Sequence, residues 1–321
     1  MLNKNILKWL LLILVVLSLI FVLFRNRSPF GRSNTSFASN PENEITRIEF
    51  TQGDDKLTLE KREDKWLLNG RIETRKSSIN FIIRVLQELN IKSPVSPELF
   101  GSEILEKGIV PVKVKTWEKR KLLSSFLVYK TQSNIYGNIM KTSNGAKPFI
   151  VYVPGHEVNI GSAFILNELY WQPYTIFNLL PSEIALIDFE SLSDSANSFS
   201  ITRTKRRFEL TDGTKNLSNG DSTLISRYIS YFTYIPFESW ALDVADAEKD
   251  SIISGQPVYR ISVTMVTGEK TVLTLWERTT EKGEKDSDRM YGKTDSSDGI
   301  FVVRYFDIDP LLKKRSYFFG K

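Results

Sequence analysis

The sequence EITRIEF at residues 44–50 recurs in altered form as EIALIDF at residues 183–189. Both stretches follow the pattern Glu-Ile-x-x-Ile-acid-Phe. The last Ile and the Phe stand at alternate positions, as Ile48 and Phe50 do, so their side chains fall on one face of an extended chain. The two stretches therefore predict the first strands of two similar units, each strand with one buried face.

A hairpin is predicted after each of these strands. In the first copy the charged turn Lys61 to Asp64 separates two apolar-patterned strands, and Asn69-Gly70 ends the second of them. In the second copy Arg203 to Arg207 separates the corresponding strands, and Asp212-Gly213 closes them. Asn-Gly and Asp-Gly supply the positive-φ positions that tight turns need.

One helix per copy is predicted next. A 3.6-residue apolar repeat indicates a helix with one buried stripe. The repeat comprises Ile79, Ile82, Ile83, Leu86 and Leu89 in the first copy, and Ile225, Tyr228, Ile229, Phe232 and Ile235 in the second.

Antiparallel strands are predicted to complete each copy. Each contains a Tyr-Gly step, Tyr136-Gly137 and Tyr291-Gly292, and a closing apolar strand, Phe149 to Val153 and Phe301 to Tyr305. Six matches in the same order indicate an internal duplication.

The predicted fold class is therefore α+β: an N-terminal transmembrane helix, then two similar units of antiparallel strands with one helix each. The units are residues 44–155 and 183–321, and the aromatic-rich segment 156–182 connects them. The aromatic side chains of this segment suggest packing between the copies.

The run from Trp9 to Phe24 is apolar except for Ser18, which predicts an uncleaved signal anchor over residues 1–27. A cleaved signal peptide is the alternative, but the nearest small-x-small triplet, Ser36 to Ala38, lies too far downstream. Residues 28–43 are rich in Ser, Asn, Pro and Gly, which is typical of a flexible tether.

The predicted location is the inner or cytoplasmic membrane, crossed once, with the folded part extracytoplasmic. Basic side chains flank both ends of the apolar run, so their count does not decide the orientation. The very short N-terminal tail favours a cytoplasmic amino terminus.

The charge distribution argues against nucleic-acid binding. Of 43 Lys and Arg side chains, five lie before Glu42, which leaves 38 against 38 Asp and Glu in the rest of the chain. A neutral folded part lacks the electrostatic footprint of a nucleic-acid-binding protein. The absence of Cys excludes disulfides, a thiolate nucleophile and Cys-ligated zinc.

No catalytic, cofactor-binding or metal-binding residue is predicted, and an enzyme is disfavoured. His156-Glu157 begins like a zincin motif, but Ile160 stands where the second His is required. A calcium loop is suggested only by carboxylates at alternate positions, and the Gly and Glu of an EF-hand are missing. The carboxylates are Asp286, Asp288, Asp295 and Asp298. A solvated loop is the preferred interpretation of these four residues.

Two basic runs are interpreted as surface structure. Arg203 to Arg207 alternates with apolar residues as an exposed strand and turn do. The basic residues Lys313 to Arg315 precede the aromatic residues 317–319. This terminal segment is expected to pack onto the domain rather than to touch a membrane or a partner.

The strand pattern Ile-x-x-Ile, the strand Lys65-Trp66-Leu67-Leu68 and the following helix resemble the bacterial domain of unknown function 4340 family. The connection WQPYTIF, residues 171–177, is also similar to the mid-chain connection of that family. The resemblance covers most of residues 44–310, with Phe208 departing from it where the first copy has Trp66. It implies a membrane-anchored, duplicated protein that acts as an accessory at a transport complex, without established catalytic residues.

Three functions remain open from the sequence. A non-enzymatic interaction or scaffold module, an accessory subunit of an envelope transport complex of ABC or gliding type, predicts a flat apolar patch. Its partners would be the bilayer and another envelope protein, such as an ABC-type permease complex. An envelope protein that binds glycan or peptide predicts a concave aromatic groove. A hydrolase predicts paired carboxylates in a cleft with shifted pKa values.

Overall fold

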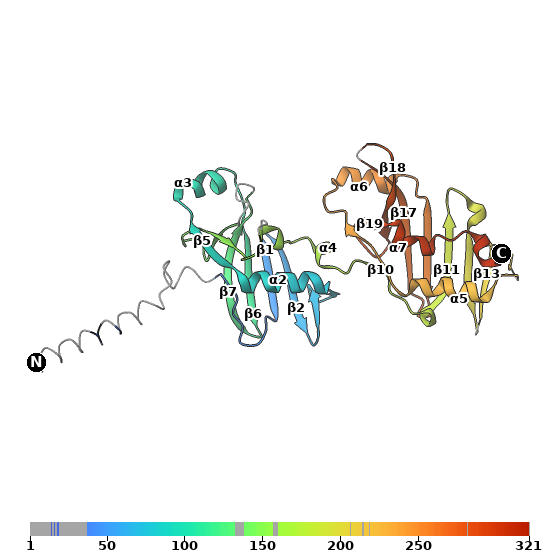
Figure 1. The fold of residues 1–321 in the computed structure, drawn as a ribbon, viewed down its shortest axis with the longest axis horizontal. Helices are drawn as coiled ribbons and strands as arrows, with labels where there is room; N and C mark the ends of the chain where they lie inside the picture. The colour runs from blue at the N-terminus through green and yellow to red at the C-terminus, as the bar shows by residue number, and fades with distance from the viewer. Residues whose placement is uncertain are drawn as a thin grey trace, which may run out of the picture. The chain divides into compact units, whose positions relative to one another are not determined.

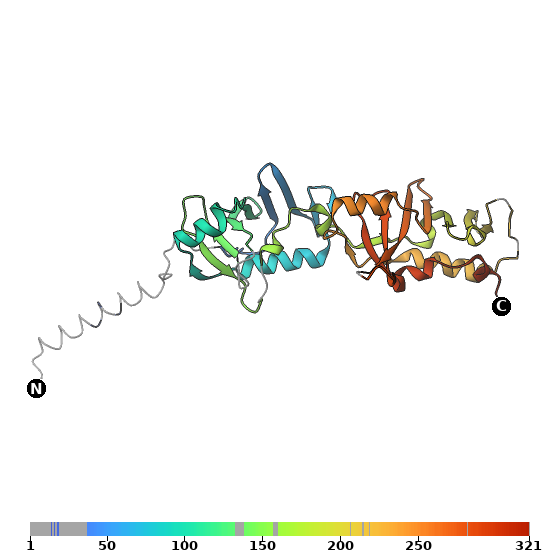
Figure 2. The same cartoon turned by 90° about the horizontal axis from the view of Figure 1, so that it is seen from above.

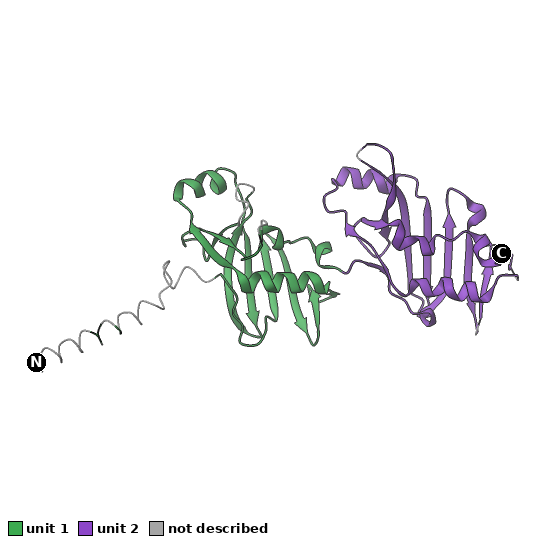
Figure 3. Cartoon of the chain, in the orientation of Figure 1, with its two compact units in different colours: residues 1–172 green, residues 173–321 purple. Residues whose placement is uncertain are grey.

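The computed structural model describes positions 14, 16 and 18 and residues 37–320, with gaps at 132–137, 157–159, 206, 214, 218 and 281. The chain divides into two compact units, residues 1–172 and 173–321 (Figure 3). The boundary between them falls inside the segment 156–182 that was predicted to connect the copies.

Unit 1 is built on a nine-stranded antiparallel sheet with the order β4-β3-β2-β1-β6-β7-β8-β9-β5 (Figure 1). Its elements in chain order are β1 Arg47–Gln52, β2 Asp55–Arg62, β3 Lys65–Leu68, β4 Ile72–Glu73, α2 Lys76–Glu88, β5 Asn90–Pro94, α3 Pro97–Phe100, the π-helical turn η1 Gly101–Leu105, β6 Val112–Glu118, β7 Lys121–Tyr129, β8 Asn138–Lys141, β9 Phe149–Tyr152, η2 Ile160–Ala163 and α4 Glu168–Trp171.

Unit 2 is built on an eight-stranded sheet with the order β13-β12-β11-β16-β17-β18-β19-β15, and a two-stranded sheet pairs β10 with β14. Its elements are β10 Thr175–Phe177, η3 Pro181–Glu183, β11 Ile184–Ser191, η4 Ser195–Asn197, β12 Phe199–Thr204, β13 Arg207–Thr211, α5 Ser222–Ser230, η5 Tyr231–Thr233, β14 Ile235–Pro236, β15 Ser239–Trp240, α6 Asp246–Ser254, β16 Tyr259–Met265, β17 Lys270–Thr279, β18 Lys285–Thr294, β19 Phe301–Arg304, α7 Tyr305–Ile308, η6 Asp309–Leu311 and η7 Arg315–Phe319.

The two large sheets have the same strand order. When β1 is matched with β11, the order β3-β2-β1-β6-β7-β8-β9-β5 becomes β13-β12-β11-β16-β17-β18-β19-β15, strand for strand. The long helix α2 or α5 occupies the same place in the chain order of each unit. Each unit also brings an early strand, β5 or β15, to the far edge of the sheet beside the last strand. This edge pairing joins segments far apart in sequence, so agreement there is strong support for a common fold.

The first strands form where the alternating pattern predicts them. Ile48 and Phe50 are fully buried in β1, where Phe50 lies opposite Leu57 of β2 and Val114 of β6. The hairpins β2–β3 and β12–β13 each have a two-residue turn, and its first residue, Glu63 or Lys205, has a positive φ of 54° or 51°. Such turns match the twist of the flanking strands.

One face of each large sheet carries the main core and is covered by the long helix. Figure 1 shows α2 running across the strands of unit 1 and α5 in the corresponding place in unit 2. Helix α2 buries Ile79, Ile82, Val85 and Leu86 against this face, and α5 buries Ile225, Tyr228 and Ile229. The helices therefore form because their apolar stripes remove the inner face of the sheet from water.

A smaller core lies on the opposite face of each sheet. In unit 2 it contains Trp276, Tyr291 and Ile300, with Ile252 of α6 packed against it. Trp276 and the buried Leu275 are neighbours in β17, so their side chains point to opposite faces. Figure 2 shows α5 and α6 on opposite sides of this sheet. In unit 1 the corresponding core contains Ile104 of η1 and Tyr129 of β7.

The predicted fold class is wrong in two respects. The structure consists mostly of antiparallel sheets, and each unit has more than the one helix predicted, because α6 and short helices such as α3 and α7 were not foreseen. In addition, the described residues contain no helix long and apolar enough to cross a membrane. The apolar run 9–24 lies outside the described residues apart from positions 14, 16 and 18.

The predicted flexible tether is also corrected over its last part. Residues 28–36 lie outside the described residues, whereas Phe37 is 1% exposed and its ring meets Phe126 edge-on at 5.9 Å. The buried hydroxyls of Ser39, Thr116 and Ser124 form a closed cycle of hydrogen bonds with O···O distances of 2.7–2.8 Å. Residues 37–39 are therefore part of the core of unit 1.

The strand register locates one of the two Tyr-Gly steps. Tyr136-Gly137 lies outside the described residues. Gly292 stands opposite Phe301, and the residue opposite the corresponding Phe149 is Met140. In the strand register the position of Gly292 therefore corresponds to that of Met140.

The aromatic residues near the boundary pack within their own units. Trp171 stacks on Phe50 at 5.7 Å in unit 1, and its indole N–H donates to the carbonyl of Ile165. Phe177 meets Phe232 at 5.2 Å in unit 2. These burials account for Trp171 and Phe177 within their own units.

Candidate functional site: an aromatic groove in unit 2

An open groove of about 970 Å³ in unit 2, which we call the aromatic groove, is lined by several aromatic side chains. One wall comes from the end of α5, from η5 and from β14, and the other from α7 and η6. The first wall comprises Ser230, Tyr231, Thr233, Tyr234, Ile235 and Pro236. The second wall comprises Tyr305, Phe306, Asp307, Asp309 and Pro310. Its volume lies at the upper end of the range for small-molecule sites.

The first wall forms where α5 tightens into the 3₁₀ turn η5. Phe232 is fully buried in this turn, and its carbonyl accepts the N–H of Leu179 at 3.0 Å. Since Phe232 occupies the inward position, Tyr231 and Tyr234 fall on the outer side. The Tyr234 side chain is 62% exposed.

The second wall forms where β19 turns directly into the four-residue helix α7. Ile308 is buried against the sheet, so Phe306, two residues before it, points outward and is 86% exposed. The Tyr228 hydroxyl of α5 donates to the Leu311 carbonyl at 2.9 Å, which fixes η6 to the main core. Burial raises the pKa of Tyr228, so its hydroxyl keeps its proton and remains a donor.

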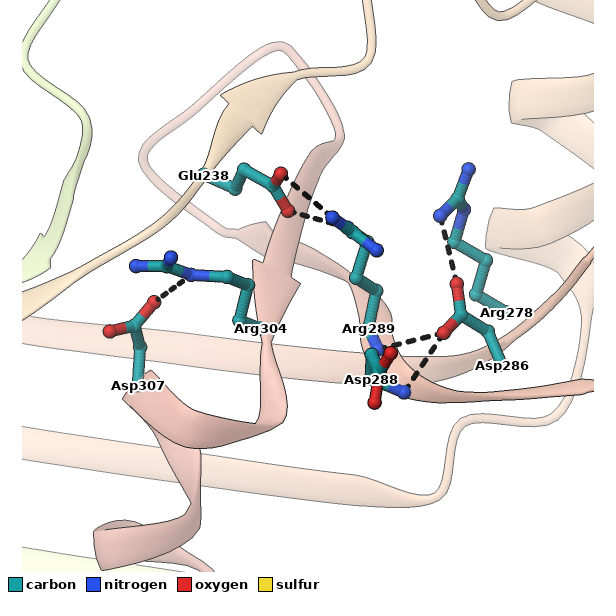
Figure 4. A network of polar contacts seen from close by, with 7 residues as sticks. All are labelled: Glu238, Arg278, Asp286, Asp288, Arg289, Arg304 and Asp307. Carbon is teal, nitrogen blue, oxygen red and sulfur yellow. Dashed lines mark hydrogen bonds and ion pairs between the residues drawn. The ribbon is translucent and has the colours of Figure 1, made fainter.

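An ion-pair network beside the groove holds its supporting segments (Figure 4). Glu238 follows β14 and accepts two hydrogen bonds from Arg289 of β18, Nε to Oε2 at 2.7 Å and Nη2 to Oε1 at 3.1 Å. This forked pair lowers the pKa of Glu238. The segment that carries the first wall is thereby tied to the large sheet.

Asp286 is the most buried carboxylate of the network. Its Oδ2 receives Arg278 at 2.9 Å, and its Oδ1 accepts the backbone N–H groups of Asp288 and Arg289 at 2.9 and 3.1 Å. Burial acts to raise the pKa of Asp286, but these backbone bonds and the charge of Arg278 outweigh it and lower the pKa. The carboxylate is therefore held ionised, which suits a structural ion pair better than a general acid.

The second wall has an ion pair of its own. Arg304 Nε lies 2.8 Å from Asp307 Oδ2, three residues along, and so fixes the first turn of α7 (Figure 4). Burial raises the pKa of the neighbouring Tyr305, which keeps that phenol neutral. Asp309 pairs with Lys313 at 2.8 Å, and its side chain remains 67% exposed.

The structure places His156 in a turn rather than in a metal site. The backbone N–H of His156 donates to the Val153 carbonyl at 3.1 Å, and the imidazole ring meets the Phe81 ring edge-on with 6.2 Å between ring centres. Glu157 lies outside the described residues. Over the part of the chain that the structure describes, no cluster of three or more His, Cys, Asp or Glu has the geometry to hold a metal ion.

The four aspartates expected in one solvated loop are separated by a strand. Asp286 and Asp288 lie near the start of β18, whereas Asp295 follows its last residue and accepts the N–H of Val272 at 2.9 Å. Nine residues of extended chain span roughly 30 Å. The loop interpretation is therefore wrong for the first two residues, which belong to the sheet.

Both basic runs are structural where the structure describes them. Arg203 donates to the carbonyls of Ile184 and Pro181, and its guanidinium lies 4.8 Å from the centre of the Phe208 ring. In the C-terminal segment Phe318 is fully buried and meets Phe199 edge-on at 4.8 Å. The expected packing of this segment onto the domain is confirmed.

The groove residues were not identified from the sequence. Tyr231 and Tyr234 stand three residues apart, off the buried stripe of α5, which is the signal that marks an exposed aromatic pair. Phe306 was not singled out from the sequence, because a four-residue helix has too few residues to show a period.

Comparisons with family models, with curated proteins and with solved structures give no match for this chain. The resemblance to the domain of unknown function 4340 family therefore stays a prediction.

Proposed function

We propose that this protein is a non-catalytic binding protein that holds an extended ligand, a peptide or a glycan, in the aromatic groove. The observation that carries this proposal is the exposure of Phe306, 86%, and of Tyr234, 62%, on a concave surface. Exposed aromatic rings lose favourable burial unless a ligand covers them, and aromatic residues dominate the energetics of binding sites.

The groove favours ligand binding over the other two functions that the sequence left open. A scaffold module was expected to present a flat apolar patch, and the exposed aromatic side chains line a hollow instead. A hydrolase was expected to hold paired carboxylates in a cleft with shifted pKa values, whereas the shifted carboxylates of this network, Glu238 and Asp286, do not line the groove. The pKa values of Glu238 and Asp286 are both lowered, by Arg289 in the first case and by backbone N–H groups in the second.

The cellular setting is a further proposal. The apolar run 9–24 and its basic flanks support attachment at the cytoplasmic membrane with the folded units outside the cytoplasm. In that position the groove would meet its ligand outside the cytoplasm. Attachment raises the local concentration of a weak binding site near its partner.

Exposed side chains allow a sharp test, because their removal leaves stability almost unchanged. The detergent-solubilised full chain is screened against immobilised peptides and glycans, together with a Phe306→Ala/Tyr234→Ala variant. Phe319→Ala is the matched control, because Phe319 is 41% exposed and does not line the groove. Ligands bound by the wild type and the control but lost in the double variant support the proposal. Equal binding by all three proteins contradicts it.

A further inference from the structure

We infer that the ligand of the aromatic groove is an extended peptide with a basic side chain next to proline or another apolar residue. This inference rests on the proposed function and specifies its ligand. It follows from the charge of the lining, from the state of its hydroxyl groups and from the strand at its edge.

The charge of the lining is complementary to a cation. Asp309 is its exposed charged side chain, since that of Asp307 is only 10% exposed, and none of the described lining residues is basic. The partners of these two carboxylates, Arg304 and Lys313, do not line the groove. The Asp309 carboxylate is 67% exposed, so a ligand ammonium or guanidinium reaches it without desolvating a buried charge.

The polar groups of the lining do not suit a sugar. The Ser230 hydroxyl donates to the Arg227 carbonyl at 2.6 Å, and the Thr233 hydroxyl donates to the Ser230 carbonyl at 2.8 Å. A sugar would therefore find these two hydroxyls already donating within the chain, and each polar group left unpaired on burial costs roughly 1–3 kcal/mol.

The apolar part of the lining suits proline. Tyr231, Tyr234, Tyr305 and Phe306 supply rings from both walls. A polyproline II segment is already extended and keeps its backbone solvated, so it docks its rings between aromatic side chains at low entropic cost. Addition of a ligand strand is disfavoured here, because β14 has two residues and the second, Pro236, has no N–H to donate.

The test measures fluorescence anisotropy with the full chain in detergent. The probe is a labelled short peptide in which prolines precede two arginines. Two comparison ligands are the same peptide with glutamates in place of the arginines, and cellohexaose as an unlabelled competitor. We expect saturable binding of the basic peptide, at least tenfold weaker binding of the acidic one, and weakening by salt.

Two variants locate the contacts. Phe306→Ala should weaken binding of the basic peptide about tenfold or more, as removal of a central aromatic anchor does. Asp309→Asn should weaken binding of the basic peptide about three- to tenfold and leave the affinity for the acidic peptide unchanged or increased. The matched control is Asp246→Asn on α6, where the carboxylate is 95% exposed and pairs with Lys249 as Asp309 pairs with Lys313. That control should bind like the wild type.

The outcomes separate this inference from the proposed function. If cellohexaose binds in a manner that depends on Phe306 and the basic peptide does not bind, the inference fails and the groove remains a binding site. Equal affinity for basic and acidic peptides also overturns the inference. If neither peptide nor glycan shows binding that depends on Phe306, both proposals fail.

Discussion

Replacing Gly292 by Ala tests the packing that supports the groove. Gly292 lies in β18 opposite Phe301, and a Cβ atom there would come within 2.3 Å of Phe301 Cε2. The ring has no free side to move into, because it stacks on Phe237 at 4.5 Å and meets Trp240 edge-on at 5.9 Å. We therefore expect Gly292→Ala to destabilise unit 2.

The magnitude follows from two opposing terms. Overpacking a core by one methyl group costs about 1–3 kcal/mol. The smaller conformational freedom of Ala in the unfolded chain offsets roughly 0.4–1 kcal/mol of this. The net loss is about 1–2 kcal/mol, which lowers the melting temperature of a unit of this size by roughly 2–8 °C.

The assay is urea unfolding monitored by tryptophan fluorescence, with the transition of unit 2 identified from Trp240 and Trp276. Gly145→Ala is the control, because its added Cβ meets no atom within 4 Å. The double variant Gly292→Ala/Phe301→Leu should recover part of the loss, because a smaller side chain makes room for the methyl group. The reasoning is refuted if Gly292→Ala is as stable as Gly145→Ala, or if Phe301→Leu destabilises both backgrounds equally.

Three further predictions concern single side chains. Glu118 accepts hydrogen bonds from the side chain and the backbone N–H of Asn43, and these bonds lower its pKa below 4.5. The ionised Glu118 therefore stabilises the folded state above pH 4.5, and this stabilisation is lost as the pH falls through the lowered pKa. The difference in urea midpoint between wild type and Glu118→Gln should therefore shrink as the pH falls below 4.5, and a difference that is constant with pH contradicts this. Tyr228→Phe leaves the buried Leu311 carbonyl without its partner and should cost about 1–3 kcal/mol in the unfolding free energy, whereas an unchanged midpoint would show that the bond at 2.9 Å is dispensable. Trp66 is only half-buried, so Trp66→Ala should cost less than the roughly 3–5 kcal/mol of a fully buried ring, and a loss within that range would place the ring deeper in the core.

Several predictions from the sequence depend on short-range chemistry, and these agree best with the structure. The alternation of Ile48 with Phe50 places both in the core, and Asn69 and Gly70 both have positive φ in the turn after β3. The apolar stripe of α2 is buried, although Val85 replaces Ile83 in it. Each of these outcomes follows from a few neighbouring residues, because the strand and helix periods and the turn preferences act within about one or two turns of chain.

Other predictions failed where a distant segment decides the outcome. β18 has the sequence KDSDRMYGKT, which gives a weak strand signal, but it is held between β17 and β19 by its backbone bonds. Asp286 is tolerated there because Arg278 of β17 lies beside it. Phe37 was assigned to a tether, because the aromatic cluster that buries it is formed by strands about 90 residues or more further along the chain.

The sequence by itself determined that the chain contains two related units, where their first strands, hairpins and long helices lie, and that the folded part is electrically neutral. Only the tertiary structure decided the pairing of β5 and β15 at the sheet edges, the two-sided core, and the aromatic groove. The groove arises because η5 and α7, about 70 residues apart in the chain, turn their buried residues Phe232 and Ile308 inward and leave Tyr234 and Phe306 outward. Local sequence decides which side chains of a strand or helix lie on the same face. The surface against which each segment packs fixes which of them face water, and that surface exists only once the distant strands have paired.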